Sequence, residues 1–395
     1  MGEVADLDPL LSDEGWPYAS TPPIEPGDPG RFHALFGRDS LITSLQVLPT
    51  RPEVAAATLR ALAARQGRRE HPGTLEAPGK IGHEFRDAAP EPIMAAGWPD
   101  DGPFAYYGTA DATSWFLVVL AATGDAALAG ELEPAWRAAG IWLAGALEEG
   151  DGLLRHSPGE WGAITQHGWR DAFDPSNPAE GGSGILRPDG TVPEPPLADT
   201  DSQAVAHAAL RALAALDPDG GWVGRADGLR ARLSRDFVPD VMAVEAGDRT
   251  VPGAGSQLGW LLWADALDPR ARDAAADRLC APDILTRFGL RTLSSDSPVF
   301  EPHAYHRGSI WPFDSWLGFG GLLAAGRPAE AERVRTGVLE ALDRLGRAPE
   351  LYAVTVAGDV EPVALSNRVQ AWTAGARWAL TNGWTGGPAL PTGRA

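Results

Sequence analysis

Carboxylates, arginines and aromatic side chains gather in five short segments of the sequence. These segments are FGRDS at 36–40, PGKIGHEFR at 78–86, HGWRDAFD at 167–174, YHRGSIWPFD at 305–314 and APELY at 348–352. A carboxyl group can give or take a proton, an arginine fork binds paired oxygens, and aromatic rings stack on apolar ligand faces. The combination predicts acid–base chemistry on a polar ligand.

The segment HGWRDAFD offers Asp171 and Asp174 as candidates for a general acid. A general acid must stay protonated near neutral pH, which an apolar surrounding favours. Trp169 can supply an apolar wall. The cation of Arg170 would lower the pKa of Asp171, so we expect its side chain to point away. The alternative is that Asp171 only caps a helix or forms an Asx turn.

Arg38 and Asp39 stand side by side at an expected helix start. Such a pair can hold two neighbouring hydroxyl groups, because the guanidinium donates hydrogen bonds and the carboxylate accepts them. The alternative is an aspartate that caps the helix beside a surface arginine.

The 305–314 segment combines aromatic, hydrogen-bond-donating and small residues ahead of an apolar helix. This composition suits stacking on a ligand and a close approach of the backbone at Gly308.

Amphipathic helices are expected to carry these segments. The pattern predicts helices at 39–48, 52–66, 109–123, 125–148, 199–216, 219–235, 254–266, 268–279, 310–326, 328–346 and 366–381. Their connections alternate between very short and very long, so the helices form hairpins whose long loops (67–108, 149–198, 236–253, 280–309 and 347–365) gather on one face. This alternation of short and long connections predicts an all-α (α/α)6 barrel. Such a barrel needs twelve helices, and the pattern shows about eleven. No convincing alternating strand is present.

The residues of these motifs and their order along the chain resemble those of the glucosidase domain of glycogen debranching enzymes (amylo-α-1,6-glucosidase) and, more distantly, those of glucoamylases. The similarity runs from about Phe36 to Trp378 and is most specific in FGRDSLIT and HRGSIWPFD. It implies an (α/α)6 fold, inversion at the anomeric carbon and no cofactor. It also implies that Asp171 is the general acid, that Glu350 of the PELY-like segment is the general base, and that Arg38 and Asp39 grip the far hydroxyls of a terminal glucose.

Two features depart from those relatives. Only an extended arm, residues 1–30, precedes the single catalytic domain expected at 31–395, where bacterial relatives commonly carry a β-rich domain. Asp201 stands where they tend to have glutamate, and Glu84, Asp201 and Glu301 are rivals of Glu350 for the role of general base.

We expect substrate contacts from Phe36, Arg38, Asp39, Lys80, His83, Glu84, Tyr107, Asp111, Trp169, Arg170, Asp201, Gln203, Tyr305, His306, Gly308, Trp311, Gln370 and Trp372. Tyr106 is expected beside Tyr107 in the same pocket, and packing at helix ends is the alternative for Tyr106, Tyr107, Asp111, Gln370 and Trp372.

Composition narrows the class of protein. A formal charge of -20 disfavours nucleic acid and anionic membranes as partners. No apolar run is long enough to span a bilayer, and the acidic start MGEVADLDPL is unlike a secretion signal. Cys280 is the single cysteine, and Glu301, His303 and His306 have no regular metal-ligand spacing. We therefore expect a cytoplasmic protein without a metal; the oligomeric state stays open.

The first functional hypothesis is an inverting α-glucosidase of the debranching type that acts on a small oligosaccharide or glycoside. A second hypothesis is hydrolysis of a small glucosyl or mannosyl compatible solute such as a glycosylglycerate, as in barrel-only relatives. Its charged aglycone would need cations, which Lys80, the only lysine in the chain, His83 and Arg86 could provide. A third hypothesis is a catalytically inactive sugar-binding protein. Fifteen tryptophans fit all three, with Trp98, Trp161 and Trp169 as loop candidates for sugar stacking.

Overall fold

The computed structural model describes residues 7–23, 31–89, 94, 97–98, 102–159 and 164–387. Helices dominate, and their bounds are α1 (Gly37–Val47), α2 (Pro52–Ala64), α4 (Ala112–Thr123), α5 (Ala126–Glu131), α6 (Glu133–Glu149), α7 (Thr200–Leu216), α8 (Trp222–Asp236), α9 (Gln257–Trp263), α10 (Pro269–Leu279), α11 (Pro312–Ala324), α12 (Pro328–Leu345) and α13 (Ala371–Asn382). Single 3-10 turns are η1 (Asp8–Leu10), η2 (Pro178–Glu180) and η3 (Ala246–Asp248).

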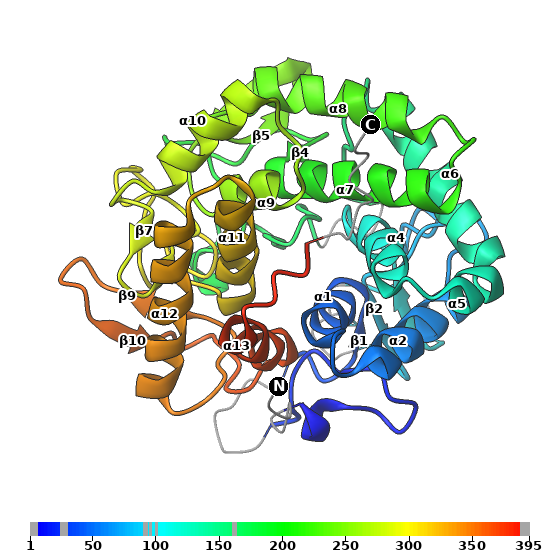
Figure 1. Ribbon diagram of the computed structural model, residues 1–395, viewed down its shortest axis with the longest axis horizontal. Helices are drawn as coiled ribbons and strands as arrows, with labels where there is room; N and C mark the ends of the chain where they lie inside the picture. The colour runs from blue at the N-terminus through cyan, green and yellow to red at the C-terminus, as the bar shows by residue number, and fades with distance from the viewer. Residues whose placement is uncertain are drawn as a thin grey trace.

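The helices form two concentric rings (Figure 1). Helices α1, α4, α7, α9, α11 and α13 make the inner ring, in which each packs on the next and α13 packs back on α1. Helices α2, α6, α8, α10 and α12 lie outside them, and each inner helix but α13 is followed by an outer one. The predicted (α/α)6 barrel is therefore confirmed. The inner helices are buried almost throughout, since they face both the barrel axis and the outer ring.

Local chemistry explains most helix ends. The carboxylates of Asp125, Asp199 and Asp268 accept backbone N–H groups at the starts of α5, α7 and α10. The predicted helix at 125–148 is instead split into α5 and α6, because Pro134 starts a new helix and lacks the N–H needed to continue the old one. The helix expected at 366–381 begins only at Ala371, because Gln370 has an extended backbone.

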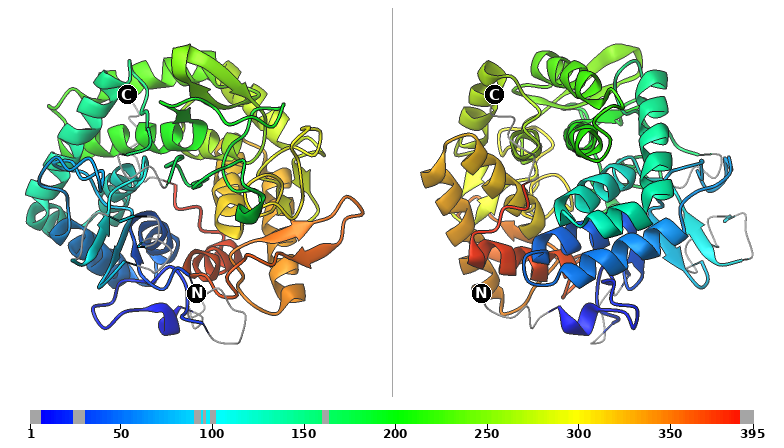
Figure 2. Two further views of the ribbon diagram at one scale, coloured as in Figure 1. Left: turned by 180° about the vertical axis from the view of Figure 1, so that it is seen from behind. Right: turned by 45° about the vertical axis from the view of Figure 1, so that its right-hand side comes forward.

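Short antiparallel strands, which the sequence did not indicate, lie in the long loops. Their bounds are β1 (Leu35–Phe36), β2 (Glu84–Arg86), β3 (Phe104–Tyr106), β4 (Ala198–Asp199), β5 (Val241–Glu245), β6 (Arg249–Pro252), β7 (Leu285–Thr286), β8 (Gly289–Leu290), β9 (Tyr352–Val354) and β10 (Val360–Pro362). They pair as β1-β2-β3, β4-β5-β6, β7-β8 and β9-β10. Strands this short show too few alternating residues to be recognised from sequence. They stiffen the loops at one end of the barrel (Figure 2).

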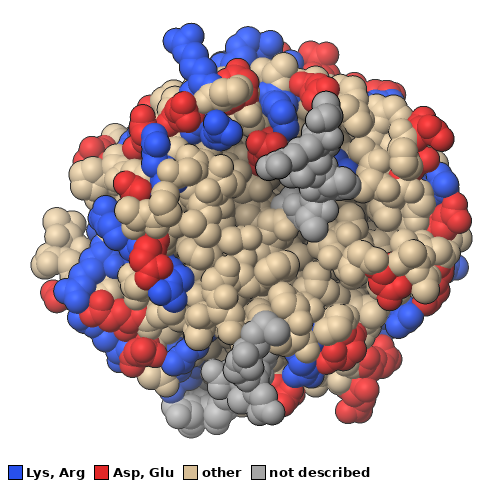
Figure 3. Space-filling view, viewed as in Figure 1, with Lys and Arg blue, Asp and Glu red and all other residues tan. Residues whose placement is uncertain are grey.

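The opposite end of the barrel is crossed by the chain after α13 (Figure 1). No outer helix follows α13 within residues 383–387; the chain is non-helical there. The Trp384 indole donates to the Leu45 carbonyl, while the indoles of Trp316 and Trp263 donate to the carbonyls of Trp384 and Thr385. This face is uncharged at its centre, with charged side chains around its rim (Figure 3).

The described part of the expected arm, residues 7–23, lies against α1, α2 and α13. The Ser40 hydroxyl donates to the Pro17 carbonyl, the Ala371 N–H donates to the Ala19 carbonyl, and Arg51 pairs with Asp8. Residues 1–6 and 24–30 of that expected arm lie outside the described residues. Among those described, no helix combines the length and apolar character that a membrane span requires.

Candidate active site

Asp171 lies in the long connection between α6 and α7, and its side chain is 32% exposed. Its Oδ2 accepts a hydrogen bond from an Arg38 guanidinium nitrogen at 2.8 Å, and the His83 Nε2 lies 4.0 Å from the same oxygen. Burial raises the pKa of Asp171 to about 6, against the opposing effect of Arg38. Asp171 can therefore hold a proton close to neutral pH.

Arg38 joins the acid to the inner ring. It sits in the first turn of α1 and is buried, and its second terminal nitrogen donates to the Asp111 Oδ1 at 3.0 Å. Thr109 also donates to that oxygen, so the side chain of Asp111, just before α4, is held in place, while burial raises its pKa. The two ends of the guanidinium are thus taken up by Asp111 and Asp171. This pairing raises the pKa of Arg38, so its cation is permanent.

Asp39, the neighbour of Arg38, lies beside the last inner helix. The Gln370 side-chain amide donates to the Asp39 Oδ2 at 3.4 Å. Burial raises the pKa of Asp39 to about 7, and the charges of Asp171 and Glu350 act in the same direction. Asp39 therefore lies in the same electrostatic field as both proposed catalytic carboxylates.

Glu350 lies in the connection between α12 and β9 and is 1% exposed. The Tyr305 hydroxyl donates to its Oε1 at 2.6 Å. Its Oε2 accepts from the Asn367 backbone N–H at 3.0 Å and from the Asn367 side-chain amide at 3.3 Å. Burial raises the pKa of Glu350 to about 7, the charge of Asp171 adds to that effect, and these three donors oppose it.

The partners of the two carboxylates differ in kind. Both oxygens of Glu350 are occupied by donors, and a proton on either would compete with them, so this arrangement stabilises the ionised form. For Asp171, the described residues provide hydrogen bonds to Oδ2 alone, which leaves Oδ1 able to carry a proton. Because the two groups interact, their titrations belong to the pair. The two carboxylates therefore differ in how many of their oxygens accept hydrogen bonds from the described residues.

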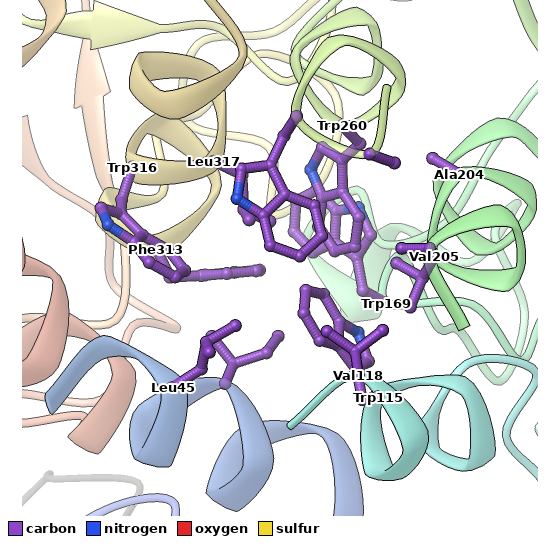
Figure 4. Packing of buried hydrophobic residues seen from close by; sticks show 14 of the residues in the cluster. Leu45, Trp115, Val118, Trp169, Ala204, Val205, Trp260, Phe313, Trp316 and Leu317 are labelled. Carbon is purple, nitrogen blue, oxygen red and sulfur yellow. The ribbon is translucent and has the colours of Figure 1, made fainter. Parts of the chain in front are cut away.

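Buried aromatic rings from the inner helices and from the loop of Asp171 pack together inside the barrel (Figure 4). Trp169 is parallel to Trp260 and meets Trp311 and Phe313 edge-on. Trp372 stacks on Phe313 with ring centroids 3.9 Å apart. Trp169 comes from the loop next to Asp171 but is as buried as the rings from the inner helices. The aromatic cluster that contains Trp169 is therefore built from several elements.

A comparison of the sequence with known protein families indicates the class of enzyme. Residues 118–353 match the family model described as mannosylglycerate hydrolase MGH1-like glycoside hydrolase domain, which is more than half of the chain. The chain belongs to this MGH1-like family of glycoside hydrolases. A search of curated proteins found no match.

Solved structures share the fold of this MGH1-like chain. A GH63 mannosylglycerate hydrolase from Thermus thermophilus, in complex with Tris and D-glycerate, matches with a TM-score of 0.67 and 16% identity over 96% of this chain and 98% of that one. The same hydrolase in complex with glucose matches with a TM-score of 0.66 and 18% identity over 96% and 98%. A structure described as wild-type glycosidase matches with a TM-score of 0.58 and 16% identity over 98% and 95%.

Several residues expected to contact substrate lie inside the protein wall of this MGH1-like fold. The Arg170 side chain points away from Asp171 and is buried, where it pairs with Asp201 at 3.1 Å and donates to Ser256 at 3.0 Å. Arg170 and Asp201 thus neutralise each other. Gln203 both donates to and accepts from the Leu154 backbone at 2.8 Å. The structure gives these three side chains partners within the protein, and their substrate contacts stay a prediction.

Two more candidates make their contacts near the outer ring. The Lys80 ammonium donates to the Leu75 carbonyl at 3.3 Å and lies 5.6 Å from the Trp142 ring centre on α6. Burial lowers the pKa of Lys80 to about 8. The Tyr107 hydroxyl donates to the Arg65 carbonyl, beyond the end of α2. These contacts lead away from Asp171 and Glu350.

Tyr106, the residue before Tyr107, faces the site instead. Its ring lies edge-on to His83, its hydroxyl is 3.4 Å from the His167 Nε2, and burial with the charge of Asp171 raises its pKa. Successive side chains of a strand point to opposite faces, and Tyr106 ends β3. The sequence suggested both tyrosines, and only the structure separates their contacts.

The remaining candidates have definite places. His83 meets Phe36 edge-on, and burial lowers its pKa well below the usual value, so it is neutral. Glu84 pairs with Arg86. His306 stacks on Trp311 and accepts the Gly184 N–H. Gly308 is required because a Cβ there would lie 2.5 Å from the Glu301 carbonyl oxygen.

Asn367 is a site residue that the sequence did not single out. Besides its two bonds to Glu350, its amide nitrogen lies 3.2 Å from the Gln370 Oε1. Its own Oδ1 is buried, and the described residues supply no partner for it. A position three residues before the candidate Gln370 was the only available signal. Of the expected stacking tryptophans, Trp161 lies outside the described residues.

Proposed function

We propose that the chain hydrolyses a small α-glycoside of the glycosylglycerate type with inversion, using Asp171 as general acid and Glu350 as general base. The family match supports a mannosyl or glucosyl compatible solute over the debranching substrate, because the matched domain is described by mannosylglycerate hydrolysis. The Thermus thermophilus hydrolase of the same fold was solved with D-glycerate and with glucose. A cytoplasmic location stays a prediction.

The single observation behind this proposal is the contrast between the donor sets of the two carboxylates. Glu350 accepts from three donors, which favours the ionised base. Burial raises the pKa of both carboxyls, to about 6 for Asp171 and about 7 for Glu350, so the assignment rests on the donors: Asp171 has one oxygen that can carry a proton. An inverting glycosidase needs this division of roles, with room for a water between the groups, and we expect carboxyl oxygens about 6.5 to 9.5 Å apart.

In the proposed reaction, Asp171 gives its proton to the glycosidic oxygen as the bond from that oxygen to the anomeric carbon breaks. Glu350 takes a proton from a water molecule, whose oxygen forms the new bond on the opposite face of the sugar. Asp171 finishes as a carboxylate. Arg38, at 2.8 Å, stabilises the negative charge that develops there, although the same cation lowers the pKa of the resting acid.

Proton NMR during turnover tests both the substrate and the stereochemistry. The panel contains α-mannosylglycerate, α-glucosylglycerate, isomaltose and maltose. We expect the glycosylglycerates to be hydrolysed fastest and the β-anomer of the sugar to appear first. An α-anomer as first product would show retention and contradict the role of Glu350. Preference for isomaltose would return the debranching hypothesis to first place.

Two variants separate the roles of acid and base. Glu350→Gln and Asp171→Asn should each lose several orders of magnitude in kcat on a glycoside. A glycosyl fluoride needs little protonation as fluoride leaves, so this substrate should partly restore turnover in Asp171→Asn and leave Glu350→Gln inactive. Restoration in both variants, or in neither, would reject this assignment.

A further inference from the structure

The loop that carries Asp171 is closed by a carboxylate outside the proposed catalytic pair. We call residues 164–185 the acid loop. The Glu180 side chain accepts two backbone N–H groups, from Phe173 at 3.0 Å and from Asp174 at 2.6 Å. These acceptor bonds lie two and three residues after Asp171, so Glu180 restrains the backbone on one side of the acid.

The other side of Asp171 is restrained by Gln166. Its side-chain oxygen accepts the Ile185 N–H at 2.7 Å, its amide donates to the Ile185 carbonyl at 2.9 Å, and its backbone pairs with Ala172. Gln166 therefore joins the beginning and the end of the acid loop. Glu180 is then the side chain that ties the middle of the loop to the turn containing Asp171.

The same segment is bonded to the residue that holds the base. The Gly181 carbonyl accepts the Tyr305 backbone N–H at 2.7 Å, and the Tyr305 hydroxyl donates to Glu350. Gly181 adopts a positive φ of 62°, and a Cβ there would lie 2.2 Å from the Leu365 side chain. A series of hydrogen bonds of 2.6 to 3.0 Å therefore links the turn after Asp171, through Glu180, Gly181 and Tyr305, to Glu350.

We propose that Glu180 is a positioning residue, which holds the acid loop against Tyr305 and so sets where Asp171 stands relative to Glu350. This inference rests on the proposed role of Asp171 as general acid. The geometry supports it because the two acceptor bonds and the Gly181 contact act on both ends of the pair.

The charge of Glu180 acts in the same direction as its geometry. Its carboxylate raises the pKa of Asp171, which helps a general acid to stay protonated. The other ionisable groups that act on Asp171, or on which it acts, are Arg38, Asp39, His83, Glu84, Tyr106, Asp111, Tyr305 and Glu350. Loss of the Glu180 charge should therefore lower the pKa of Asp171 and move the basic limb of the pH profile to lower pH.

The experiment compares wild type with Glu180→Gln, which keeps the shape of the side chain and removes its charge. Asp189→Asn is the matched control, because Asp189 also accepts a backbone N–H, from Thr191 at 3.0 Å, in an exposed turn of the same connection. Carbon-13 NMR of labelled aspartate carboxyls follows the titration of Asp171 in the free protein, with Asp171→Asn to assign its signal.

We expect Glu180→Gln to lower the pKa of Asp171 and to reduce kcat on a glycoside by about tenfold, since small misplacements of a catalytic group are costly. The loss on a glycosyl fluoride should be smaller, because that substrate needs little help from the acid. An unchanged Asp171 titration in Glu180→Gln, or an equal shift in Asp189→Asn, would overturn the role of Glu180.

The NMR titration does not depend on turnover, so the two ideas can fail separately. Full activity of Asp171→Asn would reject its role as general acid, while the titration would still report whether Glu180 acts on Asp171.

Glu180→Ala adds a second perturbation, since it removes both hydrogen bonds that the Glu180 carboxylate accepts. Rescue of the glycoside-to-fluoride rate ratio by Glu180→Asp, relative to Glu180→Ala, would support positioning, and identical ratios in the two variants would contradict it.

Discussion

Replacement of Tyr305 by phenylalanine is the sharpest test of whether the Tyr305 hydroxyl stabilises the ionised form of Glu350. The change removes one hydroxyl whose bond to the Glu350 Oε1 is 2.6 Å long and buried. A hydrogen bond to a charged group contributes about 1.5 to 3 kcal/mol. One pKa unit corresponds to about 1.4 kcal/mol, so Tyr305→Phe should raise the pKa of Glu350 by about one to two units.

The sign of the effect on activity follows from the role of the base. Glu350 must be ionised to accept a proton from water, so a higher pKa moves the acidic limb of the kcat profile to higher pH. Activity on the acidic side should fall about tenfold for each pH unit by which that limb moves, and it should recover as the pH rises. The assay is kcat against pH on the best glycoside of the NMR panel.

Tyr352→Phe is the control for this variant. The Tyr352 hydroxyl is also buried and donates at 2.6 Å, but to the Phe288 main-chain carbonyl. Both variants should therefore lose thermal stability, while only Tyr305→Phe should move the acidic limb. An acidic limb that stays in place in Tyr305→Phe, or moves equally in Tyr352→Phe, would refute the proposed stabilisation of the Glu350 carboxylate.

Three further changes test other parts of the structure. Arg38→Met should lower kcat/KM by about 10²-fold or more, since the cation acts on the charge that develops on Asp171; unchanged kinetics in a folded variant would remove that role. Asp201→Asn should cost about 3 kcal/mol or more in urea unfolding, because Arg170 loses its buried counter-ion, and an unchanged midpoint would show that the pair is dispensable. Trp384→Ala should destabilise the barrel by about 3 kcal/mol without raising KM, since it closes the end opposite the acid loop; a large rise in KM would contradict that placement.

The fold was largely readable from the sequence because helices and their connections follow local rules. The spacing of apolar residues, the capping aspartates Asp199 and Asp268 and the alternation of loop lengths all act within a few residues of the chain. Where the expectation differed, as at Pro134, the cause was also local. Strands of two to five residues escaped notice because so few residues cannot show an alternating pattern, and some strands, such as β1 and β4, pair with distant segments.

The candidate site was only partly readable. The motifs placed Arg38, Asp171, Tyr305 and Glu350 in separate segments, and the structure brings these four into one cluster. Whether a side chain in a motif faces that cluster or the wall could not be read from its type. Asp201 is one such case, since its carboxylate forms a buried ion pair with Arg170.

The sequence by itself determined the helices, the hairpin order and the end of the barrel at which the reactive side chains gather, because these depend on short-range propensity and periodicity. The tertiary structure alone decided which donors surround each carboxylate. That decision rests on contacts between distant segments, such as Arg38 with Asp171 and Tyr305 with Glu350, and on their shared burial. A pKa depends on the charges and the solvent around a group, and these exist only once the ring has closed.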